Sequence, residues 1–136
     1  MWYNKKKKQE KEVSAMHLQE SGQMYLETIY VLSKQKTAVH SIDVSEHMGY
    51  SKPSVSRAIG LLRAGGYVDM AEDGSLTLTP SGIAVAEDIY ERHTLLTELL
   101  LRLGVDRATA AEDACKMEHD ISDVTLAAIR RFMSQQ

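Results

Sequence analysis

The chain of 136 residues has one cysteine, Cys115, and only two prolines. A single cysteine excludes a disulfide within the chain, and a thiol in a reducing compartment remains able to bind a metal ion. No run approaches the roughly 18 apolar residues that a membrane-spanning helix needs, and no apolar block after the basic start resembles a signal peptide. The sequence therefore predicts a cytoplasmic protein without a membrane segment, whose 43% hydrophobic residues can form one or two small domains.

Charge is small in total and unevenly distributed. The formal net charge is -3, which by itself argues mildly against a nucleic-acid partner. Lys5 to Lys8 and Lys11 make the start basic, whereas ten acidic side chains between Glu87 and Asp123 make the C-terminal half acidic. Residues 1–17 are polar and have no apolar periodicity, so they are predicted to be a disordered, solvated tail, with contact to phosphates as the alternative.

Periodicity and capping residues predict three helices in the first half of the chain. Apolar residues at helical spacing predict one helix over residues 18–35. Ser41 is the expected N-cap of a second, short helix that ends at Gly49, since a helix C-terminus favours a left-handed residue. Ser51 is the expected N-cap of a third helix with Pro53 in its first turn, where proline loses no hydrogen bond.

A hairpin and further helices follow. Alternating β-branched and aromatic residues over 67–71 and 75–78 flank an Asp-Gly pair, which predicts a β-hairpin. Thr79-Pro80 opens a long helix that reaches Leu103, and Asp106 and Ser122 are the expected N-caps of two more helices. The predicted fold is mainly α with a small β-hairpin: a winged helix-turn-helix domain over residues 18–80 and a helical domain over residues 81–136.

In a winged helix-turn-helix, the second helix of the pair enters the major groove of DNA. The candidate DNA-binding residues on its N-terminal side are Ser51, Lys52, Pro53, Ser54, Ser56 and Arg57. The hydroxyls and Lys52 are suited to phosphates, and Arg57 is the one candidate for a bidentate contact with guanine. These residues could also be an ordinary polar helix face, but the order of helix, turn, helix and hairpin favours DNA binding.

A second signal lies near the C-terminus, where Cys115, Glu118 and His119 stand three and four residues apart. Such spacing brings a thiol, a carboxylate and an imidazole to one face of a helix. These three groups could supply part of the ligands of a metal ion. Met24 and Glu27, three apart on the first helix, and His93, which interrupts the apolar stripe of the long helix, could complete it. Taken alone, a methionine is usually core filler and a histidine on an apolar face usually a hydrogen-bonded core residue.

Five segments carry a resemblance to one family. They are residues 24–30, 53–56, 78–82, 92–93 and 114–122. In order and spacing they resemble the diphtheria-toxin-repressor (DtxR/MntR-like) family of metal-dependent transcriptional repressors. The resemblance implies that the winged domain binds double-stranded operator DNA. It also implies that residues 81–136 form a metal-binding and homodimerisation domain, and that Fe(II) or Mn(II) between the two activates DNA binding.

The resemblance also implies a set of ligands. The implied main site consists of Met24, Cys115, Glu118 and His119, as in iron-type members, while Glu27 matches a manganese-type ligand and His93 a ligand of the second site. Thr97 and Ala111 stand where iron-type members carry a glutamate and a histidine of that second site. The chain ends near the last dimer helix, so the two-domain form without an SH3-like domain is expected.

The donor types favour Fe(II), because a thioether and a thiolate are softer than the ligands that Mn(II) prefers. Mn(II) is the alternative, and Co(II), Ni(II) or Zn(II) should bind in vitro. The expected function is a metal-dependent repressor of metal-ion homeostasis genes and not an enzyme. A metal-independent winged-helix regulator that responds to a small organic effector is the alternative. A metal hydrolase with Glu118 as base is disfavoured, since no separate nucleophile, oxyanion donors or glycine-rich phosphate loop can be found.

Overall fold

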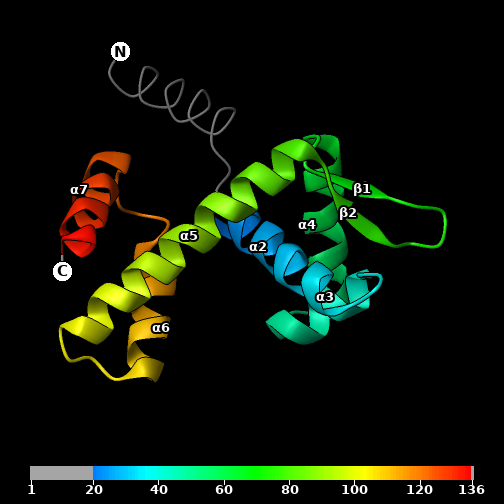
Figure 1. Ribbon diagram of the computed structural model, residues 1–136. Helices are drawn as coiled ribbons and strands as arrows, with labels where there is room; N and C mark the ends of the chain where they lie inside the picture. The colour runs from blue at the N-terminus through cyan, green and yellow to red at the C-terminus, as the bar shows by residue number, and fades with distance from the viewer. Residues whose placement is uncertain (1–19, 136) are drawn as a thin grey trace, which may run out of the picture. The chain divides into compact units, whose positions relative to one another are not determined.

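The computed structural model describes residues 20–135 (Figure 1). The predicted tail over residues 1–17 lies outside this part of the chain. The chain divides between Ile83 and Ala84 into two compact units. The described residues form six helices and one two-stranded antiparallel hairpin, which confirms the predicted fold class. No helix among them is long and apolar enough to cross a membrane.

In the N-terminal unit, the first and third helices pack against a hairpin, and the second helix packs against both of these helices. These elements are α2 (Glu20–Gln35), α3 (Ser41–Met48), α4 (Lys52–Ala64), β1 (Val68–Met70) and β2 (Leu76–Leu78). The core is made of aliphatic side chains from all five elements, among them Leu26, Ile29, Val44, Val55, Ile59, Leu62, Val68 and Leu76. Val55, Ile59 and Leu62 form the buried stripe of α4, as the apolar periodicity predicted. One face of α4 is thereby fixed against the core, and its other face is left exposed.

Local hydrogen bonds set the ends of α3 and α4. Ser51 caps α4 as predicted, with its Oγ accepting from the Ser54 amide. The expected cap of α3 was wrong by one residue: His40 is the N-cap and Ser41 begins the helix. The reason is that the Asp43 carboxylate accepts from the His40 amide at 2.8 Å, which fixes the cap one residue earlier. Hydrogen bonds from Lys36 and from the His40 amide also hold the pKa of Asp43 below its usual value.

The hairpin and the start of the long helix α5 (Pro80–Arg102) are tied together. Thr79 donates its amide to the Tyr67 carbonyl at 3.1 Å and its hydroxyl to the Gly66 carbonyl at 2.7 Å. Gly82 approaches Tyr67, the residue just before β1, so closely that a Cβ at position 82 would lie 2.2 Å from the Tyr67 carbonyl oxygen. Only glycine therefore allows α5 to begin in this position against the base of the hairpin.

The C-terminal unit consists of most of α5 with α6 (Arg107–Met117) and α7 (Asp123–Ser134). Asp106 and Ser122 cap α6 and α7, as predicted, by accepting from the amides of Thr109 and Thr125. Its buried hydrophobic side chains are Ala86, Ile89, Leu96, Ala110, Ala114, Leu126 and Met133. Large apolar side chains also stay exposed, with Val124 79% and Phe132 51% exposed on α7.

Candidate metal centre

The centre of the candidate site is the carboxylate of Glu118, which is 1% exposed. Glu118 directly follows α6, and its amide donates to the Ala114 carbonyl at 2.9 Å. Its Oε2 lies 2.9 Å from Nδ1 of His93, and its Oε1 lies 3.3 Å from Nε2 of His119. Burying a carboxylate is costly unless partners satisfy its oxygens. Here an imidazole contacts each oxygen, so three predicted ligands meet within the C-terminal unit.

Arg92 holds the backbone at this carboxylate. The side chain is buried, and its Nη1 donates to the carbonyls of Glu118 at 3.1 Å and Ile121 at 2.9 Å. Nη2 pairs with Asp123, and Nε lies 3.2 Å from Asp88. One guanidinium thus joins α5 to the turn between α6 and α7. Sequence reasoning assigned no role to Arg92, although an arginine beside a histidine on a largely apolar helix was a usable signal.

The other predicted ligands lie on two elements. Cys115 forms no disulfide and lies partly exposed on α6, three residues before Glu118. Met24 and Glu27 are partly buried and stand three residues apart on α2, in the N-terminal unit. The structure therefore brings His93, Glu118 and His119 together, while the part of Met24 and Glu27 stays a prediction.

The donors suit a divalent cation in kind, although residues 20–135 contain no cluster of three or more His, Cys, Asp or Glu side chains already arranged to hold one. The nitrogens of His93 and His119 contact the Glu118 carboxylate instead of a common point. A neutral imidazole has one nitrogen able to bind a metal. A carboxylate oxygen that contacts an imidazole N–H can instead bind a cation. Metal binding would therefore require these side chains to turn from one another towards the ion.

The predicted DNA-binding residues gather on the exposed side of α4. Ser51, Lys52, Pro53, Ser54, Ser56 and Arg57 are all exposed. At 3.6 residues per turn, Arg57 lies opposite the buried stripe of α4. Leu61, one turn further on the same side, is 69% exposed and was missed by sequence reasoning. Its signal was a second leucine beside Leu62, since only one of the two can lie in the stripe.

Two sequence models of one family match nearly the whole described chain. The model described as "Iron dependent repressor, N-terminal DNA binding domain" matches residues 17–76. The model described as "Iron dependent repressor, metal binding and dimerisation domain" matches residues 79–135. The second match contains α5, α6 and α7, and with them His93, Glu118 and His119.

Individual proteins give the same result. The transcriptional regulator MntR of Salmonella typhimurium is 32% identical over 125 residues, which are 92% of this chain and 80% of that protein. The diphtheria toxin repressor of Corynebacterium diphtheriae is 33% identical over 107 residues, 78% of this chain and 47% of that protein. A solved structure described as a manganese-dependent transcriptional repressor in complex with manganese has a TM-score of 0.77 at 30% identity. The alignment covers 83% of this chain and 52% of that one, so this chain spans about half the length of that relative. The chain therefore belongs to the iron-dependent repressor family, whose members are metal-dependent transcriptional regulators such as MntR and the diphtheria toxin repressor.

Proposed function

We propose that this protein is a repressor that binds double-stranded operator DNA as a homodimer in response to Fe(II), with Mn(II) as the alternative ion. The observation that carries the proposal is the buried Glu118 carboxylate between the imidazoles of His93 and His119. It lies in the part of the chain that matches the family's metal-binding and dimerisation domain. The regulated genes are proposed to be those of metal-ion homeostasis.

The proposed main ligands are Met24, Cys115, Glu118 and His119, with Glu27 and His93 as further donors. A thioether and a thiolate favour Fe(II) over Mn(II), and the same donors should accept Co(II), Ni(II) or Zn(II) in vitro. When bound, the ion would supply the positive charge that draws these donors together. Met24 and Glu27 belong to the N-terminal unit and the other four to the C-terminal unit, so shared ligation would restrict how the units can be placed.

This restriction would control DNA binding. The reading helices of a dimer must stand about 34 Å apart, one turn of the duplex, to reach two half-sites together. Shifting the equilibrium between placements of the units that cannot and can bind DNA from 1:99 to 99:1 needs roughly 5.5 kcal/mol of tighter metal binding to the second. Several ligand bonds from both units can supply that amount. Val124 and Phe132, the exposed apolar side chains of α7, are proposed to form part of the dimer interface.

Operator binding is expected to depend on metal. In an anaerobic mobility-shift titration, Fe(II) should raise the affinity for operator DNA by roughly 5- to 150-fold over chelator, the usual range for coupling between two sites. Mn(II) in a parallel titration ranks the two ions. Equal affinity in chelator and in metal would contradict the proposal and favour the metal-independent regulator. Thermal melts with and without metal distinguish the metal-dependent repressor from the metal-independent regulator, since a protein that binds the ion melts at a higher temperature in its presence.

Arg57 is expected to read one base pair. Arg57→Ala should relax the sequence preference at one operator position by about 1–3 kcal/mol, because a bidentate guanine contact is lost. The measurement is competition binding with operators changed one base pair at a time. Lys52→Ala is the control on the same helix. If Lys52 contacts phosphate, this change should weaken binding to all operator sequences by the same factor. A uniform loss for Arg57→Ala would instead make Arg57 a phosphate contact.

A further inference from the structure

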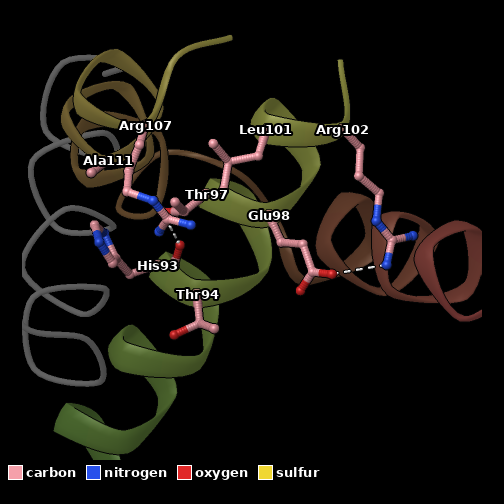
Figure 2. A pocket seen from close by; sticks show the side chains of 8 residues that line it. All are labelled: His93, Thr94, Thr97, Glu98, Leu101, Arg102, Arg107 and Ala111. Carbon is pink, nitrogen blue, oxygen red and sulfur yellow. Dashed lines mark hydrogen bonds and ion pairs between the residues drawn. The ribbon is translucent and has the colours of Figure 1, made fainter. Parts of the chain in front are cut away.

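A hollow of about 740 Å³ lies between α5 and α6, entirely within the C-terminal unit (Figure 2). Its walls include His93, Thr97 and Leu101 of α5, and Arg107 and Ala111 of α6. Sites for small molecules usually measure about 300–1,000 Å³. The hollow therefore has room for a small organic molecule, beside the ring of His93 but away from its contact with Glu118.

The lining does not suit a metal ion. The family resemblance puts a second metal site at these positions, with a glutamate and a histidine where this chain has Thr97 and Ala111. The Thr97 hydroxyl donates to the His93 carbonyl of its own helix at 2.7 Å, and Ala111 offers only a methyl group. Nδ1 of His93 already lies 2.9 Å from Glu118. Neither a helix-bonded hydroxyl nor a methyl group can replace the missing carboxylate and imidazole.

The charges of the lining leave one guanidinium in excess. Glu98 accepts from Nη2 of Arg102 at 2.8 Å, and Nη1 of Arg102 donates to the Met133 carbonyl at 3.3 Å, so these two charges compensate each other. Arg107 makes no hydrogen bond or ion pair with any residue that the structure describes. A guanidinium presents a planar set of N–H donors that matches a carboxylate. The hollow thus offers one binding group for one negative charge.

The remaining walls are mainly apolar. Leu101 and Ala111 line the hollow together with Thr94 and Thr97, whose hydroxyls donate to carbonyls of their own helix (Figure 2). We propose that this hollow takes a small organic monoanion, a carboxylate on a compact apolar body, held by Arg107 in place of a metal ion. Binding there requires neither metal nor DNA, so the proposal can fail while the proposed repressor function holds.

Benzoate is a suitable probe, followed by NMR of backbone amides in the whole chain. The expected result is saturable shifts at Thr94, Thr97 and Leu101. Benzyl alcohol, which lacks the charge, should bind about tenfold more weakly or worse, since a hydrogen bond to a charged group is lost. Inorganic phosphate should also bind more weakly, because it has no apolar body. Absence of saturable shifts, or phosphate binding as tightly as benzoate, would overturn the proposal.

Two variants assign the binding to the lining. Arg107→Gln should lower the affinity for benzoate by about tenfold. Arg131→Gln on α7, outside the lining, should leave this affinity unchanged. Both arginines are exposed, so neither change should affect folding. Equal effects of the two variants would count against the hollow as the site.

A third variant tests why the hollow is not a metal site. Thr97→Glu combined with Ala111→His restores the two donors that the family resemblance places beside His93. Anaerobic elemental analysis should then find about one more metal ion per protomer than in the natural chain, and benzoate binding should fall because a carboxylate now lies in the hollow. No gain of metal, or a metal ion in the natural chain that benzoate displaces, would contradict the inference.

Discussion

Glu118→Gln is expected to abolish the response of DNA binding to metal while the protein remains folded. Glutamine has nearly the same size, and its side-chain amide can still hydrogen bond with His93, whose Nδ1 lies 2.9 Å from Oε2 of Glu118. It lacks the negative charge that a divalent ion requires. Loss of a residue that only orients a ligand costs about 10- to 100-fold in metal affinity, so loss of a ligand itself should cost more than about 100-fold.

The measurements are a metal titration monitored by calorimetry and the mobility shift with Fe(II) or Mn(II). Glu112→Gln is the matched control: it also removes one negative charge, from α6 itself, but the Glu112 carboxylate is exposed and lies 3.8 Å from Lys116. The control should keep both the metal affinity and the DNA response. A Glu118→Gln protein that still gains DNA affinity with metal would remove Glu118 from the ligand set and leave the proposed switch without its central group.

Most of the fold could be predicted because its signals are local. Ser51, Asp106 and Ser122 each cap a helix through a hydrogen bond to an amide three residues ahead, so sequence spacing alone reveals them. The exception is also local. His40 replaces Ser41 as the cap of α3 because the side chain of Asp43 reaches back to the His40 amide, and such a reach depends on a rotamer that the sequence does not specify.

The candidate site could be predicted only in part. Glu118 and His119 are neighbours in sequence, so helical spacing indicated them directly. The contact of His93 with Glu118 joins residues 25 apart, and no periodicity predicts such a pair. The family resemblance indicated His93, but not that its Nδ1 would lie on the carboxylate. Arg92 was missed for the same reason, because all its partners except Asp88 are distant in the chain.

Arg92→Ala is expected to destabilise the C-terminal unit by about 2–4 kcal/mol. The side chain is 10% exposed, and its removal leaves the carbonyls of Glu118 and Ile121 without their donor. A lost hydrogen bond to a charged group costs roughly 1.5–3 kcal/mol, and the unpaired carbonyls and the lost packing add to this. The turn between α6 and α7 should therefore open first, and with it the backbone that carries Glu118.

Urea unfolding monitored by circular dichroism gives the overall loss, and hydrogen exchange of the α6 and α7 amides assigns it to the C-terminal unit. Arg102→Ala is the matched control on α5, since Arg102 also bonds a carboxylate and one carbonyl, Met133, but is partly exposed. It should cost less than about 1 kcal/mol. Equal losses in the two variants would show that Arg92 does not hold the turn. If the loss is confined to Arg92→Ala, while Glu118→Gln loses metal without losing stability, then one residue supports the site and the other provides its charge.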